Sequence, residues 1–204
     1  MYTPYFCLIS SYLLGSIPVG LLLGKCFGVD VRRSGSANIG ATNVSRLLGK
    51  KLGLATLIGD ALKAVLPMVV AGRLLAGHPQ GELWIMLCGG AAFLGHLYPL
   101  YIGFKGGKGV ATALGVFLYL DPLAVLIVFG IFVGIVARWR YVSAGSITAA
   151  ALMPGLLWLL GASPAKIALG LAIALLIWLK HRTNIGRLLR GEEAKWGTPA
   201  PNTQ

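Results

Sequence analysis

Long apolar stretches, separated by short polar segments, make up most of this sequence. Seven such stretches can be drawn, at roughly 4–24, 53–76, 82–102, 109–120, 122–138, 144–161 and 164–180. A helix that crosses a bilayer needs about 20 predominantly apolar residues. Residues 109–120 are short for a full crossing, so we expect this segment to be tilted, partly re-entrant or buried among its neighbours. No alternating pattern indicates a barrel, and the sequence therefore predicts an all-α membrane protein, a bundle of seven transmembrane helices.

The composition excludes a soluble domain. The chain has 204 residues, of which 56% are hydrophobic and only 12% are charged, and its mean hydropathy is +0.78. A soluble fold of this length cannot bury that much apolar surface. The 29 glycines are typical of closely packed transmembrane helices. We expect one integral membrane domain over residues 1–197 and a polar, disordered tail over 198–204.

The distribution of Lys and Arg predicts the orientation in the membrane. If the amino terminus lies outside and cations within the stretches are counted with the adjacent side, sixteen of the eighteen cations lie on the cytoplasmic side, and only Arg73 and Lys166 lie outside. This bias fits the positive-inside rule. The sixteen are Lys25, Arg32, Arg33, Arg46, Lys50, Lys51, Lys63, Lys105, Lys108, Arg138, Arg140, Lys180, Arg182, Arg187, Arg190 and Lys195. The net charge of +12 thus reflects topology and contact with anionic headgroups, not binding to nucleic acid.

Neither the cysteines nor the histidines form a metal-binding pattern. Cys7, Cys26 and Cys88 are scattered without CxxC spacing, and the three histidines are equally dispersed. We therefore expect the cysteines to be buried as small hydrophobic residues, and we expect no metal or other cofactor.

The first of three polar clusters is the stretch SGSANIGATNVSRLLGKK, Ser34–Lys51. It contains short hydrogen-bonding side chains and one arginine, namely Ser36, Asn38, Thr42, Asn43 and Arg46. Its last part, VSRLLGKK, predicts a short helix whose N-terminal amides could receive a phosphate oxyanion, and the arginine adds a cationic fork. A flexible loop followed by a helix on the membrane surface is the alternative.

The second cluster is GFKGGKGVATALG, residues 103–115. Three glycines and one lysine stand at its centre, namely Gly106, Gly107, Lys108 and Gly109. Glycines let backbone N–H groups approach an anion closely, and the lysine adds a positive charge. A Walker A loop would need glycine at 102 and Ser or Thr at 109, where this chain has Ile102 and Gly109, so nucleotide binding is not expected. A glycine-rich turn that packs helices together is the alternative.

The third cluster is KHRTNIGRLLRGEE, Lys180–Glu193, at the end of the last apolar stretch. His181 and Asn184 share a helical face if the helix continues through them. Glu193 is expected to pair with an arginine and to hold structure. A simple amphipathic anchor at the membrane surface is the alternative for His181.

A weaker element, RWRYVSAGS at residues 138–146, lies on the same predicted side. Ser143 and Ser146 could point into a shared pocket, although helix capping is the simpler explanation. Segments distant in sequence thus converge on one membrane face with groups that suit phosphate. Two phosphates, or a phosphate and a reacting carbonyl, would need this many groups, and the apolar wall around them would suit an acyl chain.

Three of these motifs resemble those of a known family. GSANIGATNVSR (35–46), GGKGVATALG (106–115) and HRTNIGRLLRGEE (181–193) are similar to the motifs of the acyl-phosphate-dependent glycerol-3-phosphate acyltransferases, the PlsY family. The likeness includes YLLGSIPVG near the start and GHLYPLYIGFKGGKG, in the same order along nearly the whole chain. The tail after Trp196 is the main departure, and it affects no site residue.

The resemblance implies a seven-helix enzyme of the bacterial inner membrane, with its amino terminus outside and its active site facing the cytoplasm. It implies transfer of the acyl group of acyl phosphate to the 1-hydroxyl of glycerol 3-phosphate. The products are then lysophosphatidate and inorganic phosphate, in the first committed step of membrane phospholipid synthesis. The implied partners are these substrates and membrane lipids, with no nucleic acid and no obligate protein partner.

The resemblance also implies roles for single residues. It makes Ser36 and Arg46 essential and gives His181 and Asn184 catalytic or substrate-orienting roles. Together with the polar groups of the first cluster, the expected substrate- and phosphate-binding residues are Asn38, Thr42, Asn43, Gly106, Gly107, Lys108, Gly109 and Ser146. Glu193 matches a family glutamate and is expected to be structural.

The residue chemistry agrees with this family. The HxxxxD dyad of the thioester-dependent acyltransferases is missing, because Leu83, Tyr101 and Gly186 lie five residues after the three histidines. No GxSxG elbow or Cys–His pair suggests an acyl-enzyme. An acyl phosphate has a good leaving group, so positioning two anionic substrates and stabilising the oxyanion could supply most of the acceleration.

A transporter for organic phosphates is the competing class. Its binding site should lie near the middle of the membrane, whereas the ionisable groups here crowd one interface, and no inverted repeat is visible. Asp60 and Lys63 are the one buried-looking pair in the sequence, and we expect them to brace the second apolar stretch.

Overall fold

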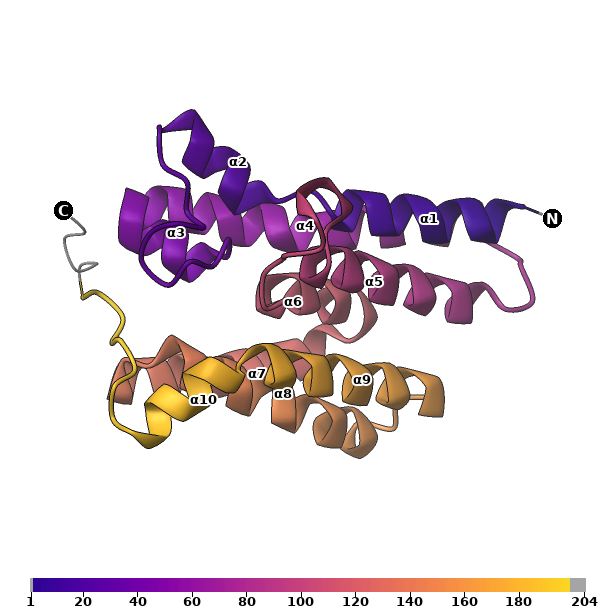
Figure 1. Cartoon of the computed structure of the whole chain (residues 1–204). Coiled ribbons are helices and arrows are strands. Elements are labelled where there is room, and N and C mark those ends of the chain that lie inside the picture. The colour runs from indigo at the N-terminus through magenta and orange to yellow at the C-terminus, as the bar shows by residue number, and fades with distance from the viewer. Residues whose placement is uncertain (1, 199–204) are drawn as a thin grey trace. The chain divides into compact units, whose positions relative to one another are not determined.

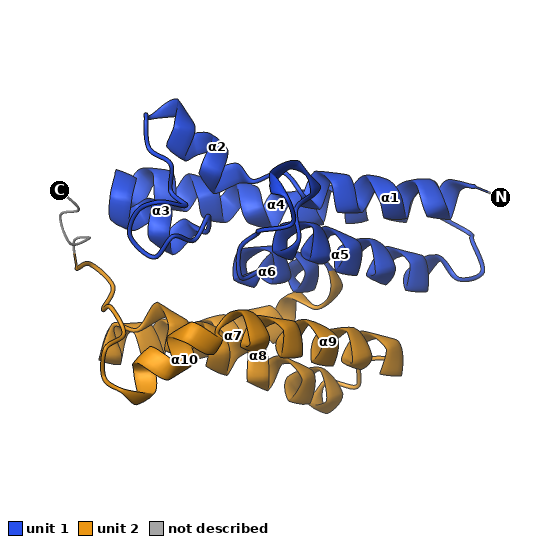
Figure 2. Cartoon of the chain, viewed as in Figure 1, with its two compact units in different colours: residues 1–119, 199–204 blue, residues 120–198 orange. Residues whose placement is uncertain are grey.

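The computed structural model describes residues 2–198, and its regular elements are all helical over that range (Figure 1). The helices form two compact units (Figure 2). Unit 1 extends to Tyr119, and unit 2 spans Leu120–Thr198. A single domain over 1–197 stays a prediction. The tail predicted at 198–204 lies outside the described residues except for Thr198.

Unit 1 is built around three packed helices. Its elements are α1 (Thr3–Gly15), α2 (Val19–Cys26), α3 (Ala41–Leu48), α4 (Lys50–Leu74), α5 (Gly81–Leu97), η1 (Leu100–Ile102) and α6 (Val110–Leu120). The helices α1, α4 and α5 pack against one another, and the shorter α2 and α3 both contact α4 (Figure 1). The two polar clusters of this unit are the segment before and within α3 and the segment between η1 and α6.

Glycines let α1 and α5 approach closely. A Cβ at Gly15 would overlap the backbone of Ala92, and a Cβ at Gly95 would overlap the backbone of Tyr12. Small residues are typical of helix contacts in membranes, where close van der Waals packing drives association. This reciprocal contact fixes the end of α5, which carries His96 next to Gly95.

The first apolar stretch is a broken helix. The chain leaves α1 at Gly15 and enters α2 at Val19, after Pro18, which has no N–H to donate. At this break the Ile17 carbonyl accepts a hydrogen bond from Lys63 Nζ of α4, at 2.9 Å. Lys63 Nζ also lies 2.9 Å from Asp60 Oδ1, so the buried pair that the sequence predicts is present.

Unit 2 consists of consecutive helices with short connections. They are α7 (Pro122–Trp139), α8 (Val142–Leu159), α9 (Pro164–Lys180) and α10 (Arg182–Leu189). Asp121 caps α7 by accepting from the Ala124 N–H at 3.1 Å, and Ser163 caps α9 by accepting from the Lys166 N–H at 3.4 Å. Proline occupies the first position of both helices, where its missing N–H costs nothing. The α8 helix packs against both α7 and α9 and contacts α10.

All seven predicted apolar stretches contain helix, but fewer than seven helices are long enough to cross a membrane. Within residues 2–198, five spans qualify by length and hydropathy, namely Thr3–Cys26, Lys50–Leu74, Gly81–Ile102, Pro122–Trp139 and Val142–Leu159. A sixth qualifies if α9 and α10, which are bent by 60°, count as one span. The α6 helix has 11 residues and is thus about 16 Å long, roughly half the thickness of the hydrocarbon core. Seven crossings and the side of each loop stay predictions.

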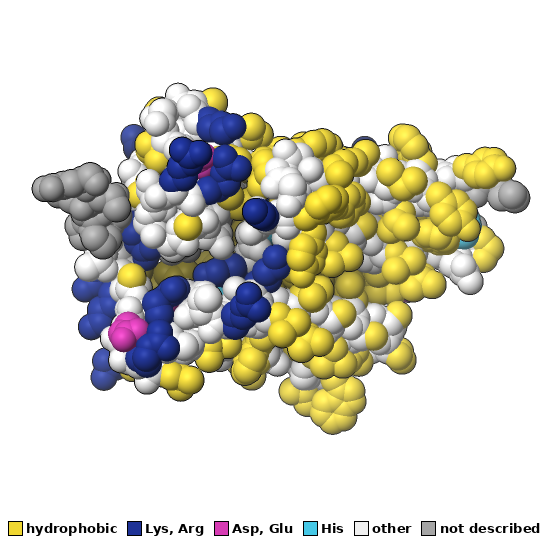
Figure 3. All heavy atoms as spheres, in the orientation of Figure 1, with side chains coloured by type: hydrophobic (Ala, Val, Ile, Leu, Met, Phe, Trp, Pro, Cys, Tyr) yellow, Lys and Arg dark blue, Asp and Glu magenta, His cyan; other side chains and the backbone are white. Residues whose placement is uncertain are grey.

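Each unit has a cationic end. On the face shown in Figure 3, Lys and Arg side chains of unit 1 gather over the region of α2 and α3, and those of unit 2 gather at the α10 end. On the same face, hydrophobic side chains cover much of the rest of both units. Exposed large hydrophobic residues include Phe6, Ile9 and Leu126. A lipid environment accounts for such exposure, because in water so large an apolar surface would drive aggregation.

Candidate active site

The first polar cluster folds into a loop followed by α3. This helix begins three residues before the predicted VSRLLGKK segment and ends at Leu48, before Gly49, whose φ of 92° favours glycine. Lys50 and Lys51 therefore start α4 and do not extend α3, which corrects the predicted boundary. The start of α3, at Gly40, has no side-chain cap, so its first N–H groups are suited to an anion.

Asn43 holds this loop together. Its side chain is buried, with 2% exposed, and its Oδ1 accepts a hydrogen bond from the Ser36 N–H at 2.9 Å. Its Nδ2 lies within hydrogen-bonding distance of the carbonyl oxygens of Val31, Ser34 and Asn38, at 2.9, 3.1 and 2.9 Å. Both ends of the amide are thus engaged inside the loop. The structure thus gives Asn43 a supporting place in the loop. The phosphate contact predicted for Asn43 would require breaking one of these bonds, and it stays a prediction.

The side chains around Asn43 are more accessible to a ligand. Ser36 and Thr42 are exposed, and Asn38 and Arg46 are half-buried. Asn38 Oδ1 accepts from the Gly40 N–H at 2.8 Å, whereas the Arg46 guanidinium has no ion pair within residues 2–198.

Ala37, between Ser36 and Asn38, has a φ of 54°, which is uncommon for a residue with a side chain. The loop therefore presents the Ser36 hydroxyl on a strained backbone, as binding loops often do, and the helix that follows adds the Arg46 guanidinium.

The second cluster lies against the end of α5. The Gly107 N–H donates to the His96 carbonyl at 3.1 Å, so this amide is not available to a phosphate. A Cβ at Gly106 would overlap the His96 carbonyl oxygen, and a Cβ at Gly107 would overlap the His96 ring. Close packing alone thus explains these two glycines. Lys108 follows directly and is half-buried; its phosphate contact stays a prediction.

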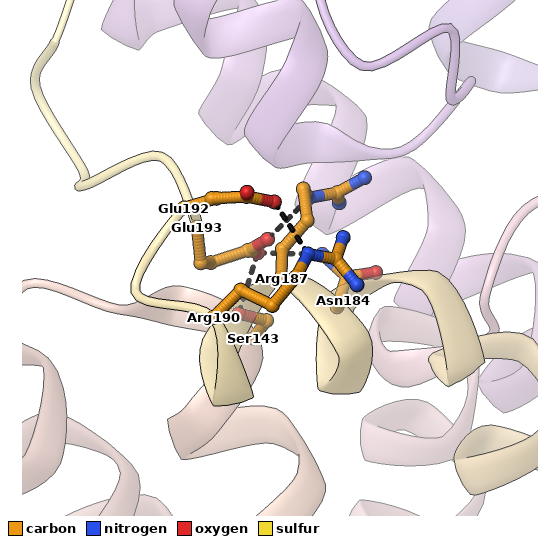
Figure 4. A network of polar contacts seen from close by, with 6 residues as sticks. All are labelled: Ser143, Asn184, Arg187, Arg190, Glu192 and Glu193. Atoms are coloured by element: carbon orange, nitrogen blue, oxygen red, sulfur yellow. Dashed lines mark hydrogen bonds and ion pairs between the residues drawn. The ribbon is translucent and has the colours of Figure 1, made fainter.

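In unit 2 the third cluster is centred on Glu193 (Figure 4). One carboxylate oxygen, Oε1, accepts hydrogen bonds from Ser143 Oγ at 2.7 Å and from Asn184 Nδ2 at 2.6 Å. The other, Oε2, accepts from Arg187 Nε at 2.7 Å. Arg187 is thus the arginine partner that the sequence predicts for Glu193. The carboxylate joins α8, α10 and the segment that follows α10.

A second contact fastens the same C-terminal segment. The Trp196 N–H donates to the Arg140 carbonyl at 2.6 Å, and the Trp196 carbonyl accepts from Arg140 Nη2 at 2.8 Å. Arg140 ends α7 with a φ of 64°, which turns the chain sharply into α8. The backbone after Glu193 is therefore held at Trp196, and the bonds to Ser143, Asn184 and Arg187 fix the direction of the carboxylate.

His181 and Asn184 do not lie on one continuous helix. The chain bends by 60° between α9 and α10, and His181 occupies the bend. Both side chains are nevertheless buried, with 3% and 5% exposed. His181 Nδ1 lies 2.8 Å from the Ile177 carbonyl oxygen, and when Nδ1 carries the proton for this bond, Nε2 is the nitrogen that can accept one.

The two serines of α8 have different partners. Ser143 bonds Glu193, as described above, while Ser146 Oγ donates to the Val142 carbonyl of its own helix at 2.9 Å. Neither serine caps α8, because its N-terminus has no side-chain cap bond. The capping explanation therefore does not hold, and a substrate contact of the buried Ser146 stays a prediction.

The contacts around Glu193 favour its ionised form in the folded protein. Burial alone would raise the pKa of Glu193, but hydrogen bonds from Ser143, Arg187 and Asn184 together lower it. Because the pKa is lower in the folded protein, the carboxylate contributes stability above its unfolded pKa of about 4.3. This contribution is lost as the pH falls through the lowered pKa of the folded state.

We expect the thermal midpoint of the protein in detergent to fall on acidification from about pH 6 to about pH 3. The fall should be smaller for Glu193→Gln, whose amide does not titrate, although this variant starts from a lower midpoint. Glu192→Gln is the matched control, because the Glu192 side chain is 57% exposed and, among the described residues, forms an ion pair with Arg190 alone. Equal falls for the wild-type protein and Glu193→Gln would show that Glu193 does not contribute to acid sensitivity.

Residues 5–191 match the family model described as glycerol-3-phosphate acyltransferase. The chain belongs to the glycerol-3-phosphate acyltransferase family. A family member from Desulfotalea psychrophila is 58% identical over 186 residues, which cover 91% of this chain and 94% of that protein. Another, from Trichlorobacter lovleyi, is 51% identical over 191 residues, covering 94% and 96%.

Solved structures agree with this family assignment. The crystal structure of PlsY (YgiH), an integral membrane glycerol 3-phosphate acyltransferase, in its glycerol 3-phosphate form has a TM-score of 0.89 and 42% identity, covering 96% of each chain. Its lysophosphatidic acid form has a TM-score of 0.86. The resemblance to the PlsY family drawn from the three motifs is thus confirmed. With its apolar helices, this member of the glycerol-3-phosphate acyltransferase family is a multi-pass membrane protein.

Proposed function

We propose that this protein transfers the acyl group of acyl phosphate to the 1-hydroxyl of glycerol 3-phosphate, giving lysophosphatidate and inorganic phosphate. The likeness to PlsY in its glycerol 3-phosphate and lysophosphatidic acid forms supports glycerol 3-phosphate as the acceptor and lysophosphatidate as the product. The acyl phosphate donor rests on the three motifs and on the missing HxxxxD dyad. The reaction would begin membrane phospholipid synthesis.

Arg46 is the residue best suited to hold a phosphate in unit 1. Its guanidinium is not engaged within the described residues, and it presents several donors in a fixed fork. Ser36 and Thr42, both exposed near the start of α3, and Asn38 position phosphate or carbonyl oxygens. Lys108 supplies a second cation, and the N–H groups of Gly106 and Gly109 supply further donors.

In unit 2 the proposed catalytic groups are His181 and Asn184. The amide of Asn184 is oriented by Glu193, and the ring of His181 is oriented by the Ile177 carbonyl. His181 Nε2 can act as general base toward the acceptor hydroxyl. Ser146 serves as a further contact for substrate. Glu193 acts through Asn184 and touches no substrate.

We propose direct transfer without an acyl-enzyme. The acceptor hydroxyl oxygen attacks the acyl carbonyl carbon and forms the ester bond, while the bond from this carbon to the phosphate oxygen breaks and phosphate leaves. The hydroxyl proton passes to His181 or to the departing phosphate. The cations screen the repulsion between two anionic substrates, and positioned donors stabilise the oxyanion. Acyl label that stays on denatured enzyme after a single turnover would disprove direct transfer.

The membrane arrangement belongs to the same proposal. The bias of sixteen of eighteen cations supports an outside amino terminus and a cytoplasmic active site. The seven apolar stretches support seven crossings, and the family resemblance supports the inner membrane. The chain acts as one domain without cofactor or obligate protein partner. Reaction of a membrane-impermeant thiol reagent with a single cysteine placed at exposed Arg33, in intact cells, would contradict this orientation.

The donor is tested by supplying purified protein and glycerol 3-phosphate with either palmitoyl phosphate or palmitoyl-coenzyme A. We expect lysophosphatidate from palmitoyl phosphate and none above background from the thioester. Comparable rates with both donors would contradict the proposed dependence on acyl phosphate and leave only the family's acyltransferase activity.

A further inference from the structure

We infer that His96 is a positioning residue that sets the path of the Gly106–Gly109 loop, and that Asp60 and Lys63 hold His96 in place. The inference rests on the proposed function, in which this loop and Lys108 bind a substrate phosphate. The sequence motifs assign no role in the reaction to any of these three buried side chains.

The loop follows the surface of His96 on two sides. The His96 carbonyl accepts the Gly107 N–H at 3.1 Å and leaves no room for a Cβ at Gly106. The His96 ring lies against the Cα of Gly107, where a Cβ would overlap Nε2. Since Lys108 is the next residue, the position of His96 determines where the backbone of Lys108 begins.

His96 is in turn held from α4. Its Nδ1 lies 3.4 Å from Asp60 Oδ1, and the same oxygen lies 2.9 Å from Lys63 Nζ. All three residues are buried, with 3%, 2% and 6% exposed. Lys63 Nζ also donates to the Ile17 carbonyl at the break between α1 and α2. The cluster therefore joins the break, α4, α5 and the glycine-rich loop of unit 1.

The energetics favour a role beyond packing. Ionisable side chains inside apolar helices are costly, and well-packed apolar residues of similar volume would often serve stability equally well. What apolar residues cannot supply is a carboxylate oxygen beside Nδ1 of the ring, whose attraction for a ring N–H favours one rotation of the imidazole. Supporting contacts of this kind are what keep a binding loop within the narrow geometry that catalysis requires.

A double-mutant cycle tests the contact between the ring and the loop. KM is measured for glycerol 3-phosphate and for acyl phosphate. We expect Gly107→Ala to raise KM about 10- to 100-fold for whichever of the two substrates the loop binds, because the new Cβ displaces the loop from the His96 ring. His96→Ala alone should raise the same KM about 10-fold and change kcat less than about threefold. In the His96→Ala background, adding Gly107→Ala should change KM less than about threefold, because the ring that it overlaps is gone.

Gly106→Ala is the matched control. Its Cβ would meet the His96 carbonyl, which every residue at position 96 retains, so its effect on KM should be the same with and without His96→Ala. A purely structural role would lower the amount of folded enzyme and the apparent kcat, but it would leave KM of the folded fraction unchanged.

Additive effects of Gly107→Ala and His96→Ala on KM, with an active wild-type protein, would overturn the inference and leave the proposed function intact. An unchanged KM in His96→Ala would do the same. A wild-type protein that forms no lysophosphatidate from acyl phosphate would overturn the proposed function and the inference that rests on it.

Discussion

Replacing Arg46 by alanine is expected to lower kcat/KM for lysophosphatidate formation about 100- to 1,000-fold. The guanidinium is half-buried on α3 beside the exposed Ser36 loop and has no ion pair within the described residues. Its fork of donors thus faces no competing carboxylate. Without it, two anionic substrates would have to approach each other with less screening and without a bidentate contact.

Two further variants make this expectation specific. Arg46→Lys keeps the charge but loses the planar fork, so we expect its activity to lie between those of the wild-type protein and Arg46→Ala. Arg33→Ala is the control for a general loss of positive charge, because the Arg33 side chain is 85% exposed on the segment that leads into the same loop. Equal loss in Arg33→Ala and Arg46→Ala would indicate that bulk charge, and not a specific contact, attracts the substrates.

Replacing Asn43 by alanine is expected to lower the free energy of unfolding by about 2–4 kcal/mol. The change removes the hydrogen bond to the Ser36 N–H and leaves three loop carbonyls without their shared donor. The loop would also become mobile, so activity should fall even in the fraction that stays folded. Thermal unfolding in detergent, together with lysophosphatidate formation, measures both effects.

Two variants separate the support given by Asn43 from substrate contact. Asn43→Asp keeps the shape of the side chain but sets a carboxylate oxygen against carbonyl oxygens, so it should destabilise the protein at least as much as Asn43→Ala. Asn38→Ala removes a single bond to the Gly40 N–H and should cost less than about 1.5 kcal/mol. A stable, inactive Asn43→Ala variant would instead support the direct phosphate contact that the sequence suggested.

The helical fold and the polar clusters could be predicted from local patterns. Apolar stretches of 17 or more residues are unambiguous, and the Asp60–Lys63 pair follows from its helical spacing within such a stretch. Boundaries were harder to predict. Residues such as Lys50 and Lys51 suit a helix on either side of Gly49, and only the backbone turn at this glycine shows to which helix they belong.

What individual site residues do could not be predicted, because it depends on contacts between distant segments. Asn43 and Asn38 look alike in the sequence, yet one is buried inside the loop and the other is half-buried at its edge. His96 carried no signal of its own as a single histidine in an apolar helix. The two adjacent glycines, Gly106 and Gly107, indicated that another group lies close to their backbone. The structure shows that this group is His96.

The most direct test is phosphate release by the purified wild-type protein in detergent, given palmitoyl phosphate with and without glycerol 3-phosphate. We predict that release requires glycerol 3-phosphate and is matched mole for mole by lysophosphatidate. Release that does not depend on glycerol 3-phosphate, or no release at all, would contradict the proposed transfer from acyl phosphate.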